Sequence, residues 1–323
     1  MGLSAAADGR PGAAAAAAGP RVPEFQLANG QSMPAMALNT AGLSAEASEA
    51  AVREAARLGL RHVDFHPGIE RDGVARAMKD LGRDALFLTT KIRKFKDEPA
   101  DPAAAAARAA GQIAEDFGVL GVREVDMLLL RDSPSCEVMQ AQWRVLEDAL
   151  AAGQARSIGV INYCEKALTC LLQTARVTPA VNYFMLHAGM GADAHGLRSF
   201  GEARGIRTFA YGALGEPGPS TELLENPTLQ RIGDAHGRSP AQVALRWVAQ
   251  TGAAVSVRPS ADFGLGRSTC AGEPCRAGLR ERVGALGFEL TPGEVAEISA
   301  MASPDGNPTL FSSPGCRGCF GCA

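Results

Sequence analysis

Eight short apolar runs alternate with longer segments of helical pattern, and this alternation constrains the fold more than any other feature of the chain. The runs are apolar on both faces, which is typical of parallel strands covered by helices. They span residues 36–40, 60–65, 86–91, 125–131, 157–161, 180–185, 207–211 and 253–257. Eight such strands are what a closed (β/α)8 TIM barrel requires, so we expect that α/β fold.

The segments between the runs begin with recognisable helix starts. Asp101-Pro102 places a capping side chain before an alanine-rich helix. Ser239 and Gln242 have the spacing of a capping box. An open doubly wound sheet is the rival architecture, but it would need a glycine-rich phosphate loop after an early strand, and no G-x-G-x-x-G follows one here. We therefore expect one barrel over residues 23–302.

Charge and hydropathy limit the classes of partner. The 323 residues carry a net charge of −3 without a block of like charge, so no nucleic-acid surface is predicted. No apolar run reaches the roughly 18–20 residues needed to span a bilayer. We expect a soluble, cytoplasmic protein that needs no membrane and acts on small molecules. Its oligomeric state is left open.

The two ends of the chain differ from its middle. Residues 1–22 are rich in alanine and glycine, and they lack the basic start and apolar core of a secretory signal. This composition predicts a disordered extension, with organelle targeting as the alternative. Residues 303–323 contain proline, glycine, serine and cysteine without periodicity, and we expect a flexible tail there.

Eight cysteines are present, and five of them are scattered, as expected of reduced cytosolic thiols. The last three form Cys316-x-x-Cys319-x-x-Cys322, a spacing that suits a soft metal. Three ligands without a distant fourth are a weak signal, so we predict no metal site. Cys270 and Cys275 lie in a glycine-rich stretch, expected to be a loop over residues 263–275, where they could pair or supply ligands.

Two charged residues end neighbouring apolar runs. Asp64 closes one run within His62-Val63-Asp64-Phe65, and Lys91 closes the next. The carboxyl ends of barrel strands share one rim, where the catalytic groups of such folds lie. Because two buried charges are costly unless they are well paired, we expect Asp64 and Lys91 to meet. A functional pair and an inherited structural ion pair are both consistent with this pattern.

The order of several short motifs resembles the aldo-keto reductase family from about Pro23 to Met301. The motifs are G-L-R-H-V-D at 59–64, L-F-L-T-T-K at 86–91, A-R-S-I-G-V-I-N-Y at 155–163, A-V-N at 180–182 and S-P-A-Q-V-A-L-R-W at 239–247. The resemblance implies a barrel that binds NADPH, or sometimes NADH, without a Rossmann motif. It also implies reduction of small aldehydes and ketones by hydride transfer.

The resemblance further implies a catalytic set of Asp, Tyr, Lys and His, in which the lysine lowers the pKa of the tyrosine that protonates the carbonyl oxygen. Asp64 and Lys91 match the Asp and the Lys. The Tyr position falls on Gly68 or Ile69, and neither can donate a proton. The His position falls on Arg131, which can hold a carbonyl oxygen or a carboxylate but stays protonated.

His66 and Tyr183 are the nearby candidates for a replacement acid. We therefore expect an oxidoreductase whose catalysis is weakened or altered, with Asp64, Lys91 and Arg131 as its catalytic residues. A catalytically inactive dinucleotide-binding or scaffold protein on the same barrel is the alternative. Retention of Lys91 favours the enzyme, and the joint loss of the Tyr and His positions favours the alternative.

The cofactor positions are partly retained. The resemblance places nicotinamide against Tyr211 and its carboxamide at Asn162. At a further position, where the family usually has a glutamine, this chain has Tyr183. On the adenosine side, the lysine that meets the 2′-phosphate is displaced, so Arg258, Arg267 or Arg280 would supply the charge. The expected cofactor-binding residues are Asn162, Tyr183, Tyr211, Ser260, Arg280 and Glu281. We expect NADP, with NAD left open.

Overall fold

Eight parallel strands close into a barrel, in the order β10-β3-β4-β5-β6-β7-β8-β9. The computed structural model describes residues 22–93, 97, 99–133, 135–193, 196–215, 221–259, 270 and 272–301. The barrel strands are β3 (Met36–Asn39), β4 (His62–Asp64), β5 (Phe87–Ile92), β6 (Val125–Arg131), β7 (Ala155–Ile161), β8 (Val181–Met185), β9 (Arg207–Tyr211) and β10 (Ala254–Val257). The predicted TIM barrel is confirmed, and each predicted run overlaps a strand whose ends differ from those of the run by at most two residues.

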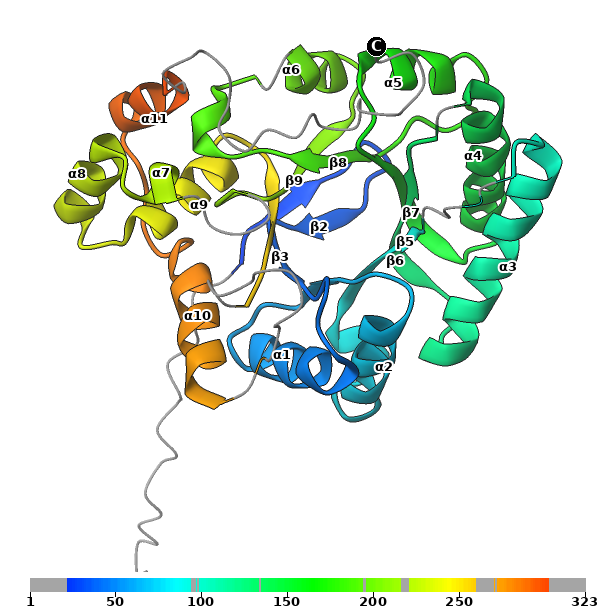
Figure 1. Ribbon diagram of the computed structural model, residues 1–323, viewed down its shortest axis with the longest axis horizontal. Helices are drawn as coiled ribbons and strands as arrows, with labels where there is room; N and C mark the ends of the chain where they lie inside the picture. The colour runs from blue at the N-terminus through cyan, green and yellow to red at the C-terminus, as the bar shows by residue number, and fades with distance from the viewer. Residues whose placement is uncertain are drawn as a thin grey trace, which may run out of the picture.

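Helices surround the ring of strands on the outside (Figure 1). They are α1 (Ala45–Arg57), α2 (Ile69–Leu81), α3 (Pro102–Leu120), α4 (Cys136–Ala151), α5 (Glu165–Leu172), α6 (Leu197–Glu202), α7 (Thr221–Leu224), α8 (Pro227–His236), α9 (Pro240–Gln250), α10 (Gly272–Gly284) and α11 (Pro292–Ser299). Asp101 caps α3 by accepting from Ala104 N, and Ser239 and Gln242 form the predicted capping box of α9. The sequence signals for helix starts are therefore confirmed at both places.

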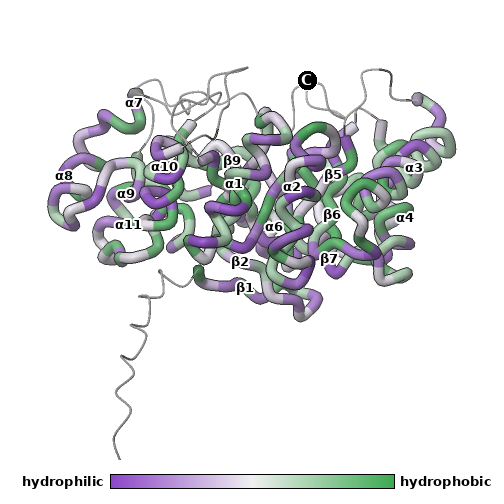
Figure 2. The backbone as a smooth tube through the Cα atoms, turned by 90° about the horizontal axis from the view of Figure 1, so that it is seen from below, coloured by the Kyte–Doolittle hydropathy of each residue, from purple (hydrophilic) through white to green (hydrophobic). Residues whose placement is uncertain are grey.

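A hairpin of β1 (Glu24–Gln26) and β2 (Ser32–Pro34) lies at one end of the barrel, as Figure 2 shows. Asn29 in its turn donates to Ser157 Oγ at 2.9 Å, and Arg207 donates to Gln26 O at 3.2 Å. Ser157 and Arg207 lie near the N-terminal ends of β7 and β9, so the hairpin covers the N-terminal end of the barrel. The opposite, C-terminal end holds the charged residues.

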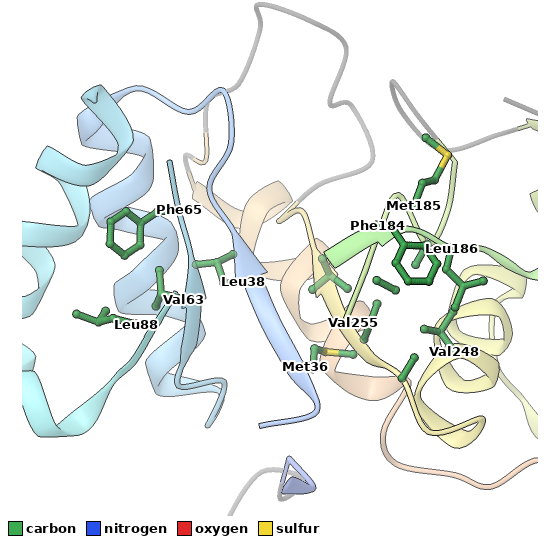
Figure 3. Close-up of a cluster of buried hydrophobic side chains, with 14 of the residues drawn as sticks. Met36, Leu38, Val63, Phe65, Leu88, Phe184, Met185, Leu186, Val248 and Val255 are labelled. Atoms are coloured by element: carbon green, nitrogen blue, oxygen red, sulfur yellow. The ribbon is translucent and has the colours of Figure 1, made fainter. Parts of the chain in front are cut away.

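Strand alternation produces two apolar cores. Outward residues pack between the strands and the helices, and Figure 3 shows two such groups, one around Val63, Phe65 and Leu88, the other around Phe184 and Val248. Inward residues, including Met127, Leu129 and Phe209, fill the barrel itself. Trp143 and Trp247 are fully buried in the outer core. Since β-strand side chains alternate, neighbouring inward positions are left for polar groups.

Two pairs of cysteines form disulfides, and the expectation of scattered reduced thiols is wrong for Cys136 and Cys170. These residues belong to α4 and α5, and their Cα atoms lie 6.0 Å apart because the two helices are neighbours on the barrel surface. Cys270 pairs with Cys275, which realises one of the two alternatives left open for them.

The predicted loop over residues 263–275 is also corrected at its end, because α10 begins at Gly272. Residues 263–269, the tail 303–323 with its three cysteines, and the predicted extension apart from Val22 lie outside the described residues. In the ranges that are described, none of the helices combines the length and hydropathy required to traverse a bilayer.

Candidate functional site

Polar side chains from several strands point into the C-terminal end of the barrel. On β4, Val63 faces outward, so His62 and Asp64 face inward. Asp64 lies beside Thr89 in the β4–β5 register, and Lys91 follows two residues later on the same face of β5. The same alternation places Tyr183 of β8 and Ser256 of β10 inside the barrel. The period of two along each strand therefore directs these groups toward one another.

The carboxylate of Asp64 accepts hydrogen bonds from three other strands. Lys91 Nζ donates to Asp64 Oδ1, and it also donates to the backbone oxygen of Phe65 at 3.1 Å. Tyr183 Oη and Ser256 Oγ both donate to Asp64 Oδ2, at 2.5 Å and 2.7 Å. Asp64 and Lys91 are completely buried. The structure thus brings the two charged residues together, and we call Asp64, Lys91, Tyr183 and Ser256 the Asp64 cluster.

Burial and charge act in opposite directions on the buried pair. Burial alone would raise the pKa of Asp64, but the Lys91 charge and the hydrogen bonds hold it below its ordinary value. Burial lowers the pKa of the Lys91 ammonium, and the negative charge of Asp64 opposes that effect. Each partner therefore keeps the other ionised, as expected of a well-bonded buried ion pair.

Tyr183 is held as a neutral phenol. Burial and the adjacent Asp64 carboxylate raise the pKa of Tyr183 well above its ordinary value. Its ring stacks on Phe209 with 4.4 Å between centroids, and its hydroxyl accepts from Asn39 Nδ2 at 3.2 Å. The Lys91 ammonium lies 5.5 Å from the ring centroid. A phenol of raised pKa that already donates to a carboxylate is a poor acid, and its hydroxyl is committed to the Asp64 cluster.

Neither Gly68 nor Ile69, the two positions after β4 that match the catalytic tyrosine, carries a proton donor. Gly68 precedes α2 with φ +122°, a conformation that residues with a Cβ rarely adopt. Ile69 is the first residue of α2, and it is 61% exposed. The next residue, Glu70, is buried, and its carboxylate accepts from Gly42 N at 2.5 Å. Burial raises the pKa of Glu70, the nearest acid on this segment.

Arg131 ends β6 and meets His66 across the mouth of the barrel. Arg131 Nη2 donates to His66 Nε2 at 3.0 Å, so the neutral imidazole carries its proton on Nδ1. Burial and the positive charges of Lys91, Arg131 and Arg258 hold the pKa of His66 well below its ordinary value. The structure therefore joins a residue predicted to hold substrate oxygen with one predicted only as a replacement acid.

The predicted nicotinamide side is assembled at the same end. Tyr211 is half-buried at the end of β9, and its hydroxyl donates to Asn162 Oδ1 at 2.8 Å. Asn162 has φ +58° and is the one residue other than glycine with positive φ among the described residues. Asparagine tolerates this left-handed conformation better than most residues, and such strain concentrates at functional sites. The pair presents an aromatic face and an amide beside the Asp64 cluster.

Two of the predicted adenosine-side residues, Arg280 and Glu281, make contacts on and beside α10. Arg280 is exposed and pairs with Glu273 on the same helix, α10. Glu281 accepts from Ser239 Oγ at 2.7 Å and from Arg282 Nη1 at 2.7 Å. Arg258 follows β10 and is half-buried. Ser260 and Arg267 lie outside the described residues.

Sequence reasoning missed three residues of the site. Ser256 belongs to the Asp64 cluster, Asn39 donates to its Tyr183, and Glu70 closes the β3–α1 turn through Gly42. Asn39 is a polar residue near the end of an apolar run, the same signal that identified Asp64. Ser256 is likewise the next-to-last residue of its run, so the same signal could have found it.

His62 lies beneath the cluster and predicts a pH dependence of stability. Burial lowers its pKa to about 4, against an ordinary value of 6.5. As the pH falls, His62 therefore binds a proton in the unfolded chain before it does so in the folded protein. The contribution of neutral His62 to the unfolding free energy is fully present above pH 6.5 and is lost between pH 6.5 and pH 4. We expect protonation of His62 alone to lower the unfolding free energy by about 3 kcal/mol between pH 6.5 and pH 4. Urea unfolding of wild type and His62→Gln at several pH values measures the difference, and parallel curves would contradict it.

Comparison with known proteins places the chain in a family. The family model described as "Aldo/keto reductase family" matches residues 33–302. The protein is an aldo/keto reductase family member. A 2,5-diketo-D-gluconic acid reductase B from Corynebacterium is 32% identical over 296 residues, covering 90% of this chain and 98% of that protein. Aldo-keto reductase family 4 member C11 from Arabidopsis thaliana is 29% identical, covering 82% of this chain and 85% of that protein.

Solved structures superimpose on the barrel. An aldo/keto reductase from Brucella melitensis superimposes with a TM-score of 0.73 at 27% identity, over 87% of this chain and 99% of that one. A point mutant of Gox0644 in complex with NADPH has a TM-score of 0.73 at 26% identity, over 88% and 96%. The resemblance noted from the short motifs is therefore confirmed for the family and the fold.

Proposed function

We propose that this family member is an NADPH-dependent oxidoreductase that reduces a small carbonyl compound, with catalysis altered by the loss of the acid phenol. The observation that carries the proposal is the buried Lys91–Asp64 pair at the barrel end that also presents Tyr211 and Asn162. Two buried charges at a catalytic rim are costly to retain. Their presence there supports a working site, as do relatives whose names denote reductases.

The retained residues fit a nicotinamide. Tyr211 offers a half-buried ring for stacking, and the strained Asn162 offers a side-chain amide for the carboxamide. NADPH, when bound, supplies the hydride for the carbonyl carbon. The NADPH complex of the Gox0644 mutant supports the choice of this dinucleotide, and Arg258 would contribute positive charge toward a 2′-phosphate. Whether NADH also serves is decided by the assay below.

The chain's own groups stabilise the oxygen of the substrate. Arg131 stands at the position that contacts this oxygen in the family, and its guanidinium would stabilise the negative charge that develops there. Lys91 adds a positive potential from below, although its complete burial keeps it from touching the substrate. Neither Arg131 nor the neutral His66 readily gives up a proton at neutral pH. We therefore assign the final proton to a water molecule, and we expect slow reduction of ordinary aldehydes.

A second candidate function is dinucleotide binding without carbonyl reduction. It is favoured by positions 68, 69 and 131, which hold Gly, Ile and Arg where the resemblance implies a phenol and an imidazole. Tyr183 does not restore the acid, because its hydroxyl donates to Asp64.

Oxidation of NADPH and of NADH with a panel of aldehydes, ketones, quinones and dicarbonyls tests the proposal. We expect substrate-dependent oxidation by wild type above that of Lys91→Met, with circular dichroism verifying that both are folded. If the folded wild-type protein oxidises neither NADPH nor NADH with any of these substrates, the proposed carbonyl reduction is rejected. Calorimetric titration with NADPH would then decide whether the binding function stands.

A further inference from the structure

Arg131 is half-buried at the mouth of the barrel, and its partner His66 carries no negative charge. Its guanidinium bonds to the neutral His66 and forms no ion pair with a carboxylate of the described residues. Other arginines with little exposure have acidic partners: Arg71 with Asp116 at 2.6 Å, Arg83 with Asp126 at 2.7 Å, and Arg282 with Glu281 at 2.7 Å. A half-buried cation without a counterion favours the binding of an anion.

Asp64 and Glu70 do not neutralise Arg131. The carboxylate of Asp64 pairs with Lys91, and the carboxylate of Glu70 accepts a hydrogen bond from Gly42 N. The positive charge of Arg258 also acts on His66 and helps to lower its pKa. His66 stays neutral and fixes the orientation of the guanidinium through one N–H. Positive charges of Lys91, Arg131 and Arg258 and the negative charge of Asp64 act on His66, and no described residue accepts from the remaining N–H groups of the Arg131 guanidinium.

The shape of a guanidinium defines the ligand. Its planar donors bind a carboxylate through two parallel hydrogen bonds, which an ammonium cannot match. In a 2-oxo acid, the carbonyl oxygen and one carboxylate oxygen can lie on the same side of the C–C bond. One guanidinium can then hold both the oxygen of the reacting carbonyl and the adjacent carboxylate.

We propose that the Arg131–His66 pair is a carboxylate-binding site, and that the substrates are carbonyl compounds with a carboxylate next to the carbonyl. This inference rests on the proposed reductase function for the identity of the reacting group. The carboxylate compensates the charge of Arg131, and the hydride acceptor is the adjacent carbonyl carbon. The carbonyl becomes an alkoxide, which takes its proton from water to give a 2-hydroxy acid, while NADPH becomes NADP⁺.

Phenylglyoxylate and its methyl ester provide a matched test, since they share one reactive carbonyl and differ in charge. We expect wild type to reduce the acid with a kcat/KM at least about tenfold above that of the ester. Arg131→Met should lower kcat/KM for the acid by about 10²-fold or more and for the ester by much less. Arg131→Lys should retain an intermediate value, because it keeps the charge and loses the fork.

Calorimetric titration with oxamate, a carboxylate whose amide carbonyl resists hydride transfer, gives a readout independent of turnover. Oxamate should bind wild type and Arg231→Met, a control that removes an exposed arginine paired with Glu297, but not Arg131→Met. If neither substrate is reduced yet oxamate binds through Arg131, the carboxylate site stands and the reductase function fails. Equal use of acid and ester, or oxamate binding that Arg131→Met leaves intact, would overturn the inference.

Discussion

Replacing Lys91 with methionine is expected to lower kcat/KM for carbonyl reduction by a factor of about 10² to 10³ and the unfolding free energy by about 3–5 kcal/mol. The first effect follows from loss of a positive charge beneath the substrate oxygen. The second follows because Asp64 is then fully buried without its counterion, so it either stays an unpaired carboxylate or takes up a proton, and both cost free energy, although Tyr183 and Ser256 still donate to it. NADPH oxidation and urea unfolding measure the two effects on the same protein.

The double variant Asp64→Asn/Lys91→Met separates these effects. Removing both charges abolishes the unpaired carboxylate, so the unfolding free energy should recover most of its loss while the rate stays low. Recovery of both quantities, or unchanged turnover in the single variant, would show that Lys91 serves the fold alone.

The second large effect is a gain. Ile69→Tyr combined with Arg131→His is expected to raise kcat/KM for simple aldehydes by about 10²- to 10⁴-fold, the usual contribution of a positioned acid. Position 69 is the better site for the phenol, because Gly68 adopts φ +122° and a tyrosine there would strain the backbone. Ile69 is largely exposed at the rim, which leaves room for the larger ring.

Ile69→Phe combined with Arg131→His is the matched control, since it adds the ring without the hydroxyl. Steady-state NADPH oxidation with a simple aldehyde compares the two variants. Equal rates would mean that the phenol does not reach the substrate oxygen, and that the chain's register after β4 differs from the family pattern. Preference for a 2-oxo acid should disappear in both variants, because Arg131 is absent.

The barrel and its charged rim were predictable because strands and polar ends are local signals. Asp64 and Lys91 each end an apolar run, and neighbouring strands bring such ends together. The bond from Tyr183 to Asp64 spans 119 residues, and the motif resemblance assigned Tyr183 to the cofactor instead. Nothing in the sequence placed its hydroxyl in the centre of the barrel.

Other contacts were unpredictable for related reasons. His66 and Arg131 meet over 65 residues of chain, and their pairing depends on the path of the loop after β4. The Cys136–Cys170 disulfide depends on the adjacency of α4 and α5, which thiol spacing does not encode. A hydrophobic period of two or 3.6 residues predicts which face of a strand or helix is buried. It does not predict which side chain of another strand that face contacts.

The three donors to Asp64 have a consequence for how the molecule assembles. Ser256 lies on the last strand, 192 residues after Asp64, and that strand also closes the ring against β3. A chain that has formed only its earlier strands would bury the carboxylate without all of its donors, a state of high free energy. Asp64 therefore gains its last donor when the first and last strands of the barrel join. The Asp64 cluster and the closed ring of strands form in one cooperative event.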